Sequence, residues 1–324
     1  MEMLNIVWFV LIVVLFTGFF ILEGFDYGVG MLLVGKSDSE RSQIIRTIGP
    51  VWDANEVWMI TAGGALFAAF PHAYATIFST FYLALFLMLL ALILRAVAFE
   101  LRGKYPALKW RRSWDCAIIF GSTVPALLWG VAIANLLQGL PIDQNFHFLG
   151  NFFDLLSPYT IITGLVFVTL FLFHGACFLM LRLADNRLLL NIKENGVKLG
   201  VIAVAFYFVF LALTTNSINF VFAILALLYA LYSFISAKYK FAFISSTISI
   251  AALTIGFFTA LFPCIMVSSF DIQNSLTIFN AASTPHTLAI MTGAALVLVP
   301  IVLIYQFWSY KIFKARVSIH DVNH

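Results

Sequence analysis

The feature that most limits how this chain can fold is a series of apolar runs, each about 16 to 28 residues long, that continues along the whole sequence. A hydrocarbon core about 30 Å thick requires about 20 helical residues, because each residue of an α-helix adds about 1.5 Å. Of the 324 residues, 62% are hydrophobic and 10% are charged, whereas about a quarter of the residues in a soluble domain are charged. The chain has too few polar side chains to cover a surface in water, so we predict an all-α, polytopic integral membrane protein.

Nine of these runs are expected to cross the membrane as helices, within a single membrane domain that covers residues 1–324. The expected spans are 6–33, 51–70, 75–99, 115–137, 159–183, 197–213, 220–235, 241–262 and 287–313. The first run is longer than the apolar core of a signal peptide and has no small-residue cleavage pattern, so we expect it to be retained. Two longer connections, near 138–158 and 264–285, are expected to fold over the outer face.

The distribution of Lys and Arg predicts the orientation, because basic residues are retained on the cytoplasmic side during insertion. All 18 of them lie in alternate connections, in the helix ends beside those connections, or after the last span. The other connections, around 71–76, 138–158, 214–219 and 263–285, contain none. This pattern predicts an odd number of spans, with the N-terminus outside and the C-terminus in the cytoplasm. The net charge of +3 gives no indication of a nucleic-acid partner, because only its distribution is informative.

Four carboxyl residues near the cytoplasmic ends of the first two predicted helices are the candidates for chemistry. Glu23 and Asp26 lie inside the first helix, and Asp53 and Glu56 open the second. Each pair is spaced i, i+3, which places both side chains on one helix face. A carboxyl at membrane depth costs several kcal/mol unless it meets a partner or water, so both faces are expected to point into the protein.

These carboxyls have two interpretations that the residues alone leave open. In the structural interpretation, Glu23 and Asp26 pair with bases such as Arg46 or Arg95, and Asp53 supplies the negative charge that favours a helix N-terminus. In the functional interpretation, the carboxyls exchange protons through water and form a proton route from the cytoplasm. Four carboxyls on consecutive helices favour the functional interpretation more than any one of them does alone.

Histidine and cysteine give little indication of a cofactor. Only His174 lies within a predicted span, and a lone buried His is more often hydrogen-bonded than a haem ligand. Cys116, Cys177 and Cys264 lie in or beside different spans and lack metal-site spacing, so we predict packing roles. The sequence contains neither a Rossmann fingerprint nor a Walker motif. Most of the machinery for any redox chemistry would therefore belong to another chain.

Small and aromatic residues predict contacts between the first two helices. Gly24 and Gly28 form a G-x-x-x-G pattern, which lets a neighbouring backbone approach closely. Gly63 and Gly64 have a similar role in the second helix, so we expect these two helices to be in tight contact. Trp58 either anchors the second helix at the membrane interface or lines an internal path, and periodicity alone favours the anchor.

Several segments together resemble subunit II of the cytochrome bd family of respiratory quinol oxidases. They are EGFDYGVGM at 23–31, GPVWDANEVW at 49–58, TAGGALFAAFP at 61–71, LRAVAFELR at 94–102 and HGA at 174–176. The predicted topology of nine spans is also similar over the full length. The first hundred residues contain nearly all of the specific similarity, whereas RLAD at 182–185 departs from the polar, glycine-containing ending that is usual there.

The resemblance implies a function that this chain performs only within a complex. The partner is subunit I, which in this family carries the b-type haems, haem d and the quinol site. The complex oxidises quinol and reduces oxygen to water in the bacterial cytoplasmic membrane, and so generates a proton gradient. Subunit II would support subunit I and offer a cytoplasmic proton route, with Asp53 at the matching acidic position, and an oxygen path at Trp58. The resemblance also allows a structural quinone and small single-helix accessory subunits.

Two other functions are compatible with the residues. The first is a proton-coupled secondary transporter that uses Asp26 and Asp53 for coupling, since carboxyls within the membrane also serve proton-driven transport. The second is a purely structural subunit whose acidic residues connect helices. The choice between ubiquinol and menaquinol as the electron donor stays open.

Overall fold

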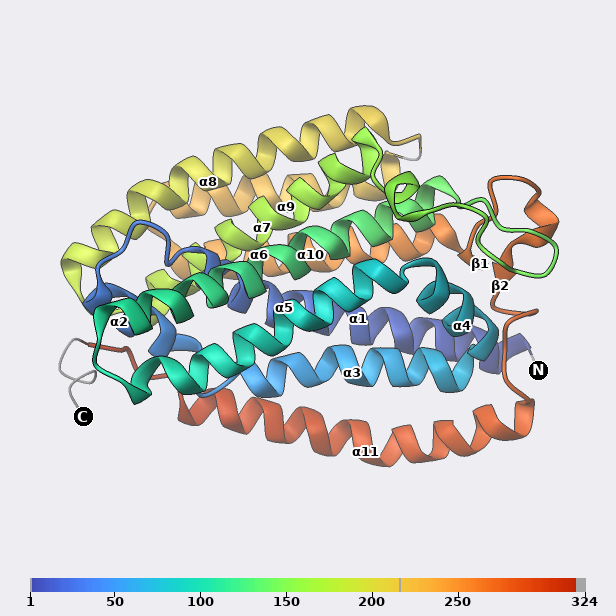
Figure 1. Cartoon of the computed structure of the whole chain (residues 1–324), viewed down its shortest axis with the longest axis horizontal. Coiled ribbons are helices and arrows are strands. Elements are labelled where there is room, and N and C mark those ends of the chain that lie inside the picture. The colour runs from blue at the N-terminus through green and yellow to red at the C-terminus, as the bar shows by residue number, and fades with distance from the viewer. Residues whose placement is uncertain (1, 216, 319–324) are drawn as a thin grey trace.

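The computed structural model describes residues 2–215 and 217–318 as a bundle of long helices (Figure 1). The α-helices are α1 (Glu2–Met31), α2 (Asp38–Ile48), α3 (Trp52–Ala69), α4 (Pro71–Thr80), α5 (Tyr82–Leu101), α6 (Leu108–Gln138), α7 (Pro158–Arg182), α8 (Asn186–Leu213), α9 (Ile218–Ile235), α10 (Tyr239–Leu261) and α11 (Pro285–Ile312). Short 3₁₀ helices η1 (Arg102–Lys104), η2 (Phe152–Leu155) and η3 (Ile272–Asn274) and strands β1 (Cys264–Met266) and β2 (Leu276–Thr277) lie in the connections. The prediction of an all-α membrane fold is confirmed.

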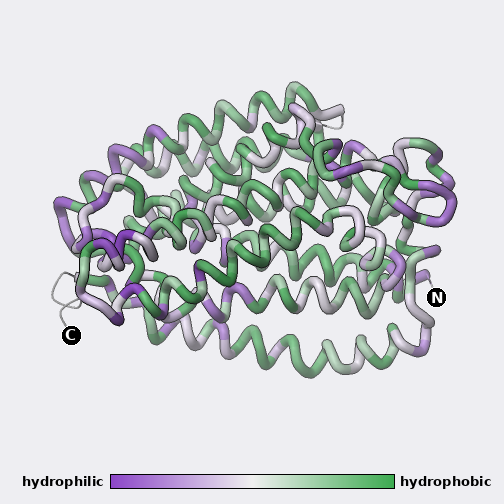
Figure 2. Tube along the Cα trace, in the orientation of Figure 1, coloured by the Kyte–Doolittle hydropathy of each residue, from purple (hydrophilic) through white to green (hydrophobic). Residues whose placement is uncertain are grey.

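Within the described residues, eight helices are long and apolar enough to cross a membrane: α1, α5 with η1, α6, α7, α8, α9, α10 and α11. The second expected span forms α3, which runs beside them although Asp53, Asn55 and Glu56 make its first turns polar. In Figure 2, apolar residues dominate the middle of the bundle and hydrophilic residues concentrate toward its ends. Nine spans, and their orientation in the membrane, therefore stay predictions.

Two expected spans differ from the helices observed. The span 75–99 is divided, because α4 ends at Thr80 and α5 begins at Tyr82. The span 197–213 is the apolar part of α8, which begins already at Asn186, where the Asp185 side chain accepts hydrogen bonds from the first backbone amides. Hydropathy marks only the lipid-facing length of such a helix, whereas the cap marks its true start.

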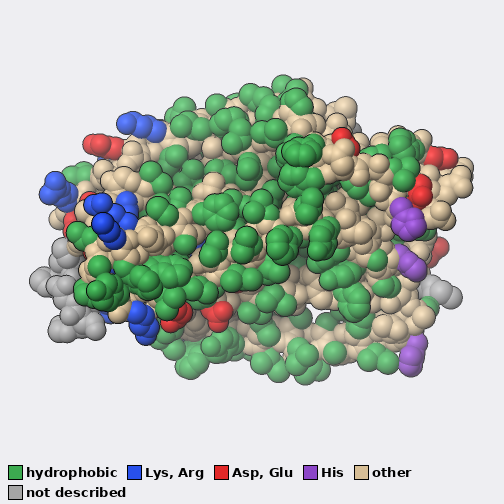
Figure 3. Space-filling model, in the orientation of Figure 1, with side chains coloured by type: hydrophobic (Ala, Val, Ile, Leu, Met, Phe, Trp, Pro, Cys, Tyr) green, Lys and Arg blue, Asp and Glu red, His purple; other side chains and the backbone are tan. Residues whose placement is uncertain are grey.

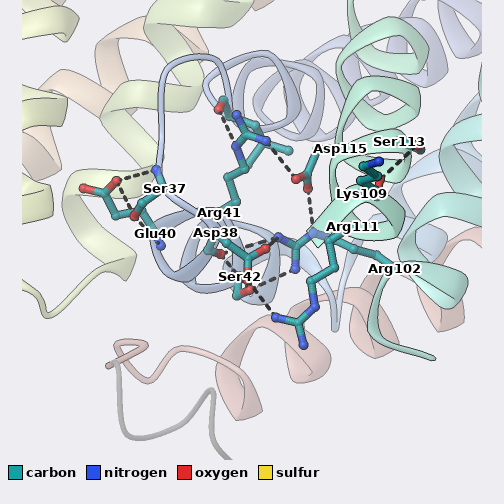
Figure 4. Close-up of polar contacts among 11 residues, drawn as sticks. Ser37, Asp38, Glu40, Arg41, Ser42, Arg102, Lys109, Arg111, Ser113 and Asp115 are labelled. Atoms are coloured by element: carbon teal, nitrogen blue, oxygen red, sulfur yellow. Dashed lines mark hydrogen bonds and ion pairs between the residues drawn. The ribbon is translucent and has the colours of Figure 1, made fainter. Parts of the chain in front are cut away.

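The end of the bundle where α1 finishes and α3 begins is called the basic end below. On the face drawn in Figure 3, Lys and Arg side chains gather there, and the His side chains lie at the opposite end. Figure 4 shows why α2 stays folded against this end: Arg41 and Arg102 both pair with the buried carboxylate of Asp115, at 2.9 and 2.6 Å. Arg102 and Arg111 pair in addition with Asp38 at the start of α2, at 2.8 and 2.7 Å. These ion pairs join α2 to η1 and α6.

The two long connections lie at the opposite end of the bundle, where they pack against each other; that this end is the outer face stays a prediction. The backbone N–H of Leu140 donates to the carbonyl of Val267 at 2.9 Å, and the N–H of Ser269 donates to the carbonyl of Leu140 at 2.8 Å. The Ser268 hydroxyl donates to the carbonyl of Ile142 at 2.9 Å. These bonds, together with the antiparallel pair of β1 and β2, give hydrogen-bond partners to backbone groups of the connections, which lie outside the helices.

Helix α1 contacts α3, α6, α7 and α10, and its glycines determine the closest of these approaches. A methyl group at Gly28 would overlap the carbonyl group of Phe171 and would lie 2.9 Å from the Cα of Gly175, both on α7. Gly63 and Gly64 of α3 have no atom within 4 Å of such a methyl group. Helices α1 and α3 are in contact, as expected, but Gly63 and Gly64 do not form this contact, and the G-x-x-x-G pair of α1 packs on α7 instead.

Aromatic rings of α1, α6 and α7 form a layer on the side of Glu23 that faces the opposite end. Phe19 and Phe20 of α1 meet the ring of Trp129 on α6, each at 5.5 Å between centroids. Phe20 also meets Phe167 of α7 at 5.3 Å, and Phe167 meets Phe171 at 5.5 Å. The four phenylalanines are buried.

Helix α11 packs loosely beside the rest, and Leu288 and Gln306 are its only buried residues in the described chain. Near its start, the indole N–H of Trp8 lies 3.2 Å from the carbonyl of Leu288 and 3.1 Å from the hydroxyl of Thr292. Near its end, Gln306 and Tyr310 contact Asn55 of α3. Polar contacts toward its two ends thus attach a helix whose middle is exposed.

Candidate buried acidic site

Three of the four predicted carboxyls meet in one buried site with an arginine. Glu23 and Asp26 come from α1, Glu56 comes from the second turn of α3, and Arg95 comes from the last turns of α5. We call these four residues the acid–arginine cluster. Glu23, Asp26 and Arg95 are almost completely buried, and Glu56 is partly exposed. The i, i+3 spacing on α1 and the cost of placing carboxyls in lipid explain why this face of the helix turns inward.

Arg95 holds the cluster together. Its guanidinium pairs with the carboxylate of Glu23, with both side chains inaccessible to solvent, and lies 3.4 Å from a carboxylate oxygen of Glu56. The guanidinium carbon also lies 4.7 Å from the centre of the Tyr27 ring, an arrangement that favours a cation. Arg46 and Arg95 were both expected as possible partners of the α1 carboxyls. Arg95 forms the ion pair with Glu23, whereas Arg46 is exposed on α2.

Asp26 belongs to a second set of contacts that reaches α11. Its carboxylate oxygen Oδ2 accepts a hydrogen bond of 2.7 Å from Nδ2 of Asn55. The side-chain oxygen Oδ1 of Asn55 in turn accepts from Nε2 of Gln306 at 3.0 Å and from the hydroxyl of Tyr310 at 2.8 Å. The site therefore joins four helices, α1, α3, α5 and α11.

Several polar atoms in this region are buried without a hydrogen-bond partner on the described chain. They are Oε2 of Glu23, Oδ1 of Asp26, the hydroxyl of Tyr27, and Nε and Nη1 of Arg95. Buried polar groups almost always have a partner, either protein or ordered water. Five such atoms within one cluster make this site suitable for bound water, which is what a route for protons requires.

The other two predicted site residues lie outside the cluster. Asp53 is exposed in the first turn of α3, three residues before Glu56 at the basic end. Trp58 packs against α1, where a methyl group at Gly18 would meet its ring. Gly18 lies near the middle of α1, so Trp58 sits between two helices at depth and the anchor interpretation is not supported.

His174 is held by hydrogen bonds from two other helices. Its Nδ1 lies 2.7 Å from the hydroxyl of Ser246 on α10, and its Nε2 lies 3.2 Å from the carbonyl oxygen of Ile21 on α1. Both ring nitrogens are therefore engaged, as expected for a hydrogen-bonded histidine and not for a haem ligand. Among the described residues, no three His, Cys, Asp or Glu side chains are grouped as a metal site would need.

Sequence reasoning missed four members of the site: Tyr27, Asn55, Gln306 and Tyr310. Asn55 lies between the two carboxyls of α3, so its position in the same polar turn could have indicated it. Gln306 is a single amide in a long apolar run, and an uncharged polar group within a membrane helix commonly bonds to another helix. Its partner lies 251 residues earlier in the chain, and no sequence spacing indicates that pairing.

Known proteins are similar to this chain along its whole length. The sequence profile described as cytochrome bd terminal oxidase subunit II matches residues 4–313. The cytochrome bd ubiquinol oxidase subunit 2 of Bacillus subtilis (strain 168) is 40% identical over 332 residues, covering 98% of each protein. The cytochrome bd-I ubiquinol oxidase subunit 2 of Escherichia coli (strain K12) is 36% identical over 370 residues, covering 99% of this chain and 97% of that protein.

The fold is also similar to a solved structure. A chain of the bd oxidase from Geobacillus thermodenitrificans superimposes with a TM-score of 0.76 at 14% sequence identity, covering 96% of this chain and 98% of that one. None of these similarities supports a transporter. The profile match and the two full-length relatives agree, and the chain belongs to the family of cytochrome bd terminal oxidase subunit II, as a multi-pass protein of the cytoplasmic membrane.

Proposed function

We propose that this chain supports the haem-bearing subunit I of a quinol-oxidising, oxygen-reducing complex and supplies that complex with protons through the acid–arginine cluster. The observation that supports this proposal most directly is that Glu23 and Glu56 pair with one buried arginine near the basic end, with Asp26 one turn from Glu23 on the same helix and bonded to Asn55. In this proposal the b-type haems, haem d and the quinol site belong to subunit I, and the basic end faces the cytoplasm. Accessory single-helix subunits would bind the periphery of the complex.

The chemistry of the complex creates a demand for protons. Reduction of one O₂ to two waters consumes four electrons and four protons, and two quinols supply the electrons while each releases two protons. If the quinol protons leave on the outside and the water protons come from the cytoplasm, charge separates across the membrane without a pump. A subunit with a one-sided proton route meets this requirement.

The charges of the cluster suit proton binding. The cluster contains three carboxyls and one guanidinium, so full ionisation would leave two negative charges uncompensated among the helices. An uncompensated charge at such a depth is costly, and binding a proton to a carboxyl removes that cost. In the proposed sequence, protons pass from water to Asp53 and Glu56, and then through Arg95-bound water to Glu23 and Asp26.

The exposed stripe along α3 is proposed to be covered by subunit I. It begins with Asp53 and continues through Val57, Ile60, Gly64 and Phe67, all of them exposed. The spacing of three and four residues places these side chains on one helix face. Glu56 is partly exposed beside this stripe. A subunit that covers the stripe would therefore receive protons directly from the cluster.

Oxygen is proposed to reach the complex along the seam where Trp58 of α3 packs on Gly18 of α1. Oxygen is apolar and dissolves in the membrane interior, so a path for it needs an apolar lining and little else. The seam is apolar and lies at the depth of the middle of α1.

If a structural quinone binds this chain, its ring is not expected in the apolar groove between α1 and α10. This groove of about 360 Å³ is lined by Phe9, Val10, Val13, Val14, Thr17, Ile255, Phe258 and Thr259. The hydroxyls of Thr17 and Thr259 both donate to carbonyls of their own helices, at 2.7 Å. Because a quinone carbonyl needs hydrogen-bond donors, the groove suits a hydrocarbon chain and not a quinone ring.

Substitution of the carboxyls tests the proton route. In the purified complex, Glu56→Gln is expected to slow quinol-driven oxygen consumption about tenfold, equivalent to about 1.4 kcal/mol on the barrier. Asp53→Asn is expected to slow it less, because this exposed group can be replaced by water at the mouth of the route. Both variants are expected to assemble, as measured by the haem spectrum that co-purifies with the chain.

Glu194→Gln is the matched control, since Glu194 is an exposed carboxyl near the start of α8, toward the basic end. Its rate is expected to equal that of the unmodified complex. Normal rates for Glu56→Gln and Asp53→Asn in correctly assembled complexes would contradict the proton route and would favour a purely structural role for these acids.

A further inference from the structure

We propose that Gln306 and Tyr310 of α11 are positioning residues for the proton route: they fix the orientation of the Asn55 amide, so that Asp26 keeps its carboxylate oxygen Oδ1 free to bind a proton. This inference rests on the proposed function, because it assigns a proton-binding atom within the acid–arginine cluster.

The hydrogen bonds at Asn55 have one consistent direction. Oδ1 of Asn55 accepts from Nε2 of Gln306 at 3.0 Å and from the hydroxyl of Tyr310 at 2.8 Å. An amide oxygen has two lone pairs, so these two donors use its full capacity. The amide nitrogen is then directed toward α1, where it donates to Oδ2 of Asp26 at 2.7 Å.

The opposite orientation of Asn55 would be unfavourable while Asp26 is ionised. The Asn55 oxygen would then face the carboxylate oxygen of Asp26, and the two acceptors would repel. The Asn55 nitrogen would face Gln306 and Tyr310, which would each have to turn from donor to acceptor. Asn55 is fully buried, so the mispaired donors and acceptors would face each other inside the protein, where such contacts are costly.

This arrangement makes the two oxygens of Asp26 unequal. Oδ2 is occupied as an acceptor by Asn55, whereas Oδ1 is buried without a hydrogen-bond partner on the described chain. A proton that reaches Asp26 therefore binds at Oδ1. The preference depends on α11, although α11 contributes no carboxyl of its own to the cluster.

Variants of the two positioning residues in the full complex test this inference. Gln306→Leu and Tyr310→Phe each remove one donor to Asn55, and the double variant removes both. The double variant is expected to slow quinol-driven oxygen consumption about fivefold. It is also expected to shift the infrared carbonyl band of protonated Asp26, identified as the band that Asp26→Asn removes.

A double-mutant cycle separates positioning from other effects. If Gln306 and Tyr310 act through Asp26, their substitution in an Asp26→Asn background should cause no further loss of rate, because the group they position is absent. An additional loss equal to that in the unmodified background would overturn the inference.

Two matched controls address the structural role of α11. Tyr305→Phe makes the same chemical change as Tyr310→Phe at an exposed position of the same helix. Trp8→Phe removes the polar contact of α11 at the opposite end, with Leu288 and Thr292, and leaves Asn55 untouched. Both controls should keep the rate and the infrared band. A loss in Trp8→Phe equal to that of the double variant would mean that loosening α11 is sufficient, which would overturn the inference.

Different results would contradict the positioning role of α11 and the proton route itself. Normal rates in Asp26→Asn and Glu56→Gln would contradict the route itself. Slow rates in those two variants, together with a normal rate and an unshifted band in Gln306→Leu/Tyr310→Phe, would contradict only the positioning role of α11.

Discussion

Replacement of Arg95 by leucine is expected to prevent accumulation of the assembled complex. Arg95 is fully buried, and it pairs with Glu23, which is also fully buried, and with Glu56. Removal of one partner of a buried ion pair leaves an uncompensated charge and costs about 3–5 kcal/mol, a large part of the 5–15 kcal/mol by which proteins are typically stable. The measurements are the amount of chain in the membrane fraction and the unfolding temperature of the solubilised complex.

A second substitution distinguishes loss of the charge pair from loss of packing. Arg95→Leu combined with Glu23→Leu removes both members of the inaccessible pair and is expected to recover much of the accumulation, since apolar replacements of buried pairs are often tolerated. Arg46→Leu serves as the matched control, because Arg46 is exposed on α2. Normal accumulation of Arg95→Leu alone would show that Glu23 does not depend on the guanidinium.

Replacement of Gly28 by alanine is expected to destabilise the chain by about 3 kcal/mol. The added methyl group would overlap the carbonyl of Phe171 and lie 2.9 Å from the Cα of Gly175. Both neighbours are backbone atoms of α7, which cannot move away as a flexible side chain can, so α1 and α7 would have to separate. Such a separation would also disturb Glu23 and Asp26 on the same helix. The measurement is again the unfolding temperature of the complex.

Gly103→Ala is the control for this substitution. Gly103 lies in η1, and a methyl group there has no atom within 4 Å, so we expect no change in unfolding temperature. If Gly28→Ala were as stable as Gly103→Ala, the close approach of α1 and α7 would not be required for the fold.

The membrane helices could be predicted well from the sequence. Lipid requires each spanning helix to have a certain length and an apolar composition, and both can be recognised without knowledge of tertiary contacts. The sequence did not predict α2, whose apolar residues Ile44 and Ile48 are buried within a polar segment too short to be a span. The break near Phe81 was missed for the opposite reason, because both sides of it are apolar.

The site could be predicted in part. The carboxyls Glu23, Asp26 and Glu56 were expected to face inward, since lipid exposure would be too costly, and the structure places them together. Their hydrogen-bond partners could not be predicted, because Asn55, Gln306 and Tyr310 meet only through the tertiary arrangement of α3 and α11. Asp53 has the same side chain as Asp26 but is exposed, because it lies in the first turn of α3. The residue type alone does not distinguish these two environments.

The aromatic layer formed by Phe19, Phe20, Trp129, Phe167 and Phe171 has an electrical consequence. In the proposed route, a proton at Glu23 meets ring faces and edges in the direction of the opposite end, and hydrocarbon of this kind does not relay hydrogen ions. The proposed route would therefore open toward the basic end only. The rings would keep the voltage across the membrane from discharging through the carboxyls proposed to carry protons.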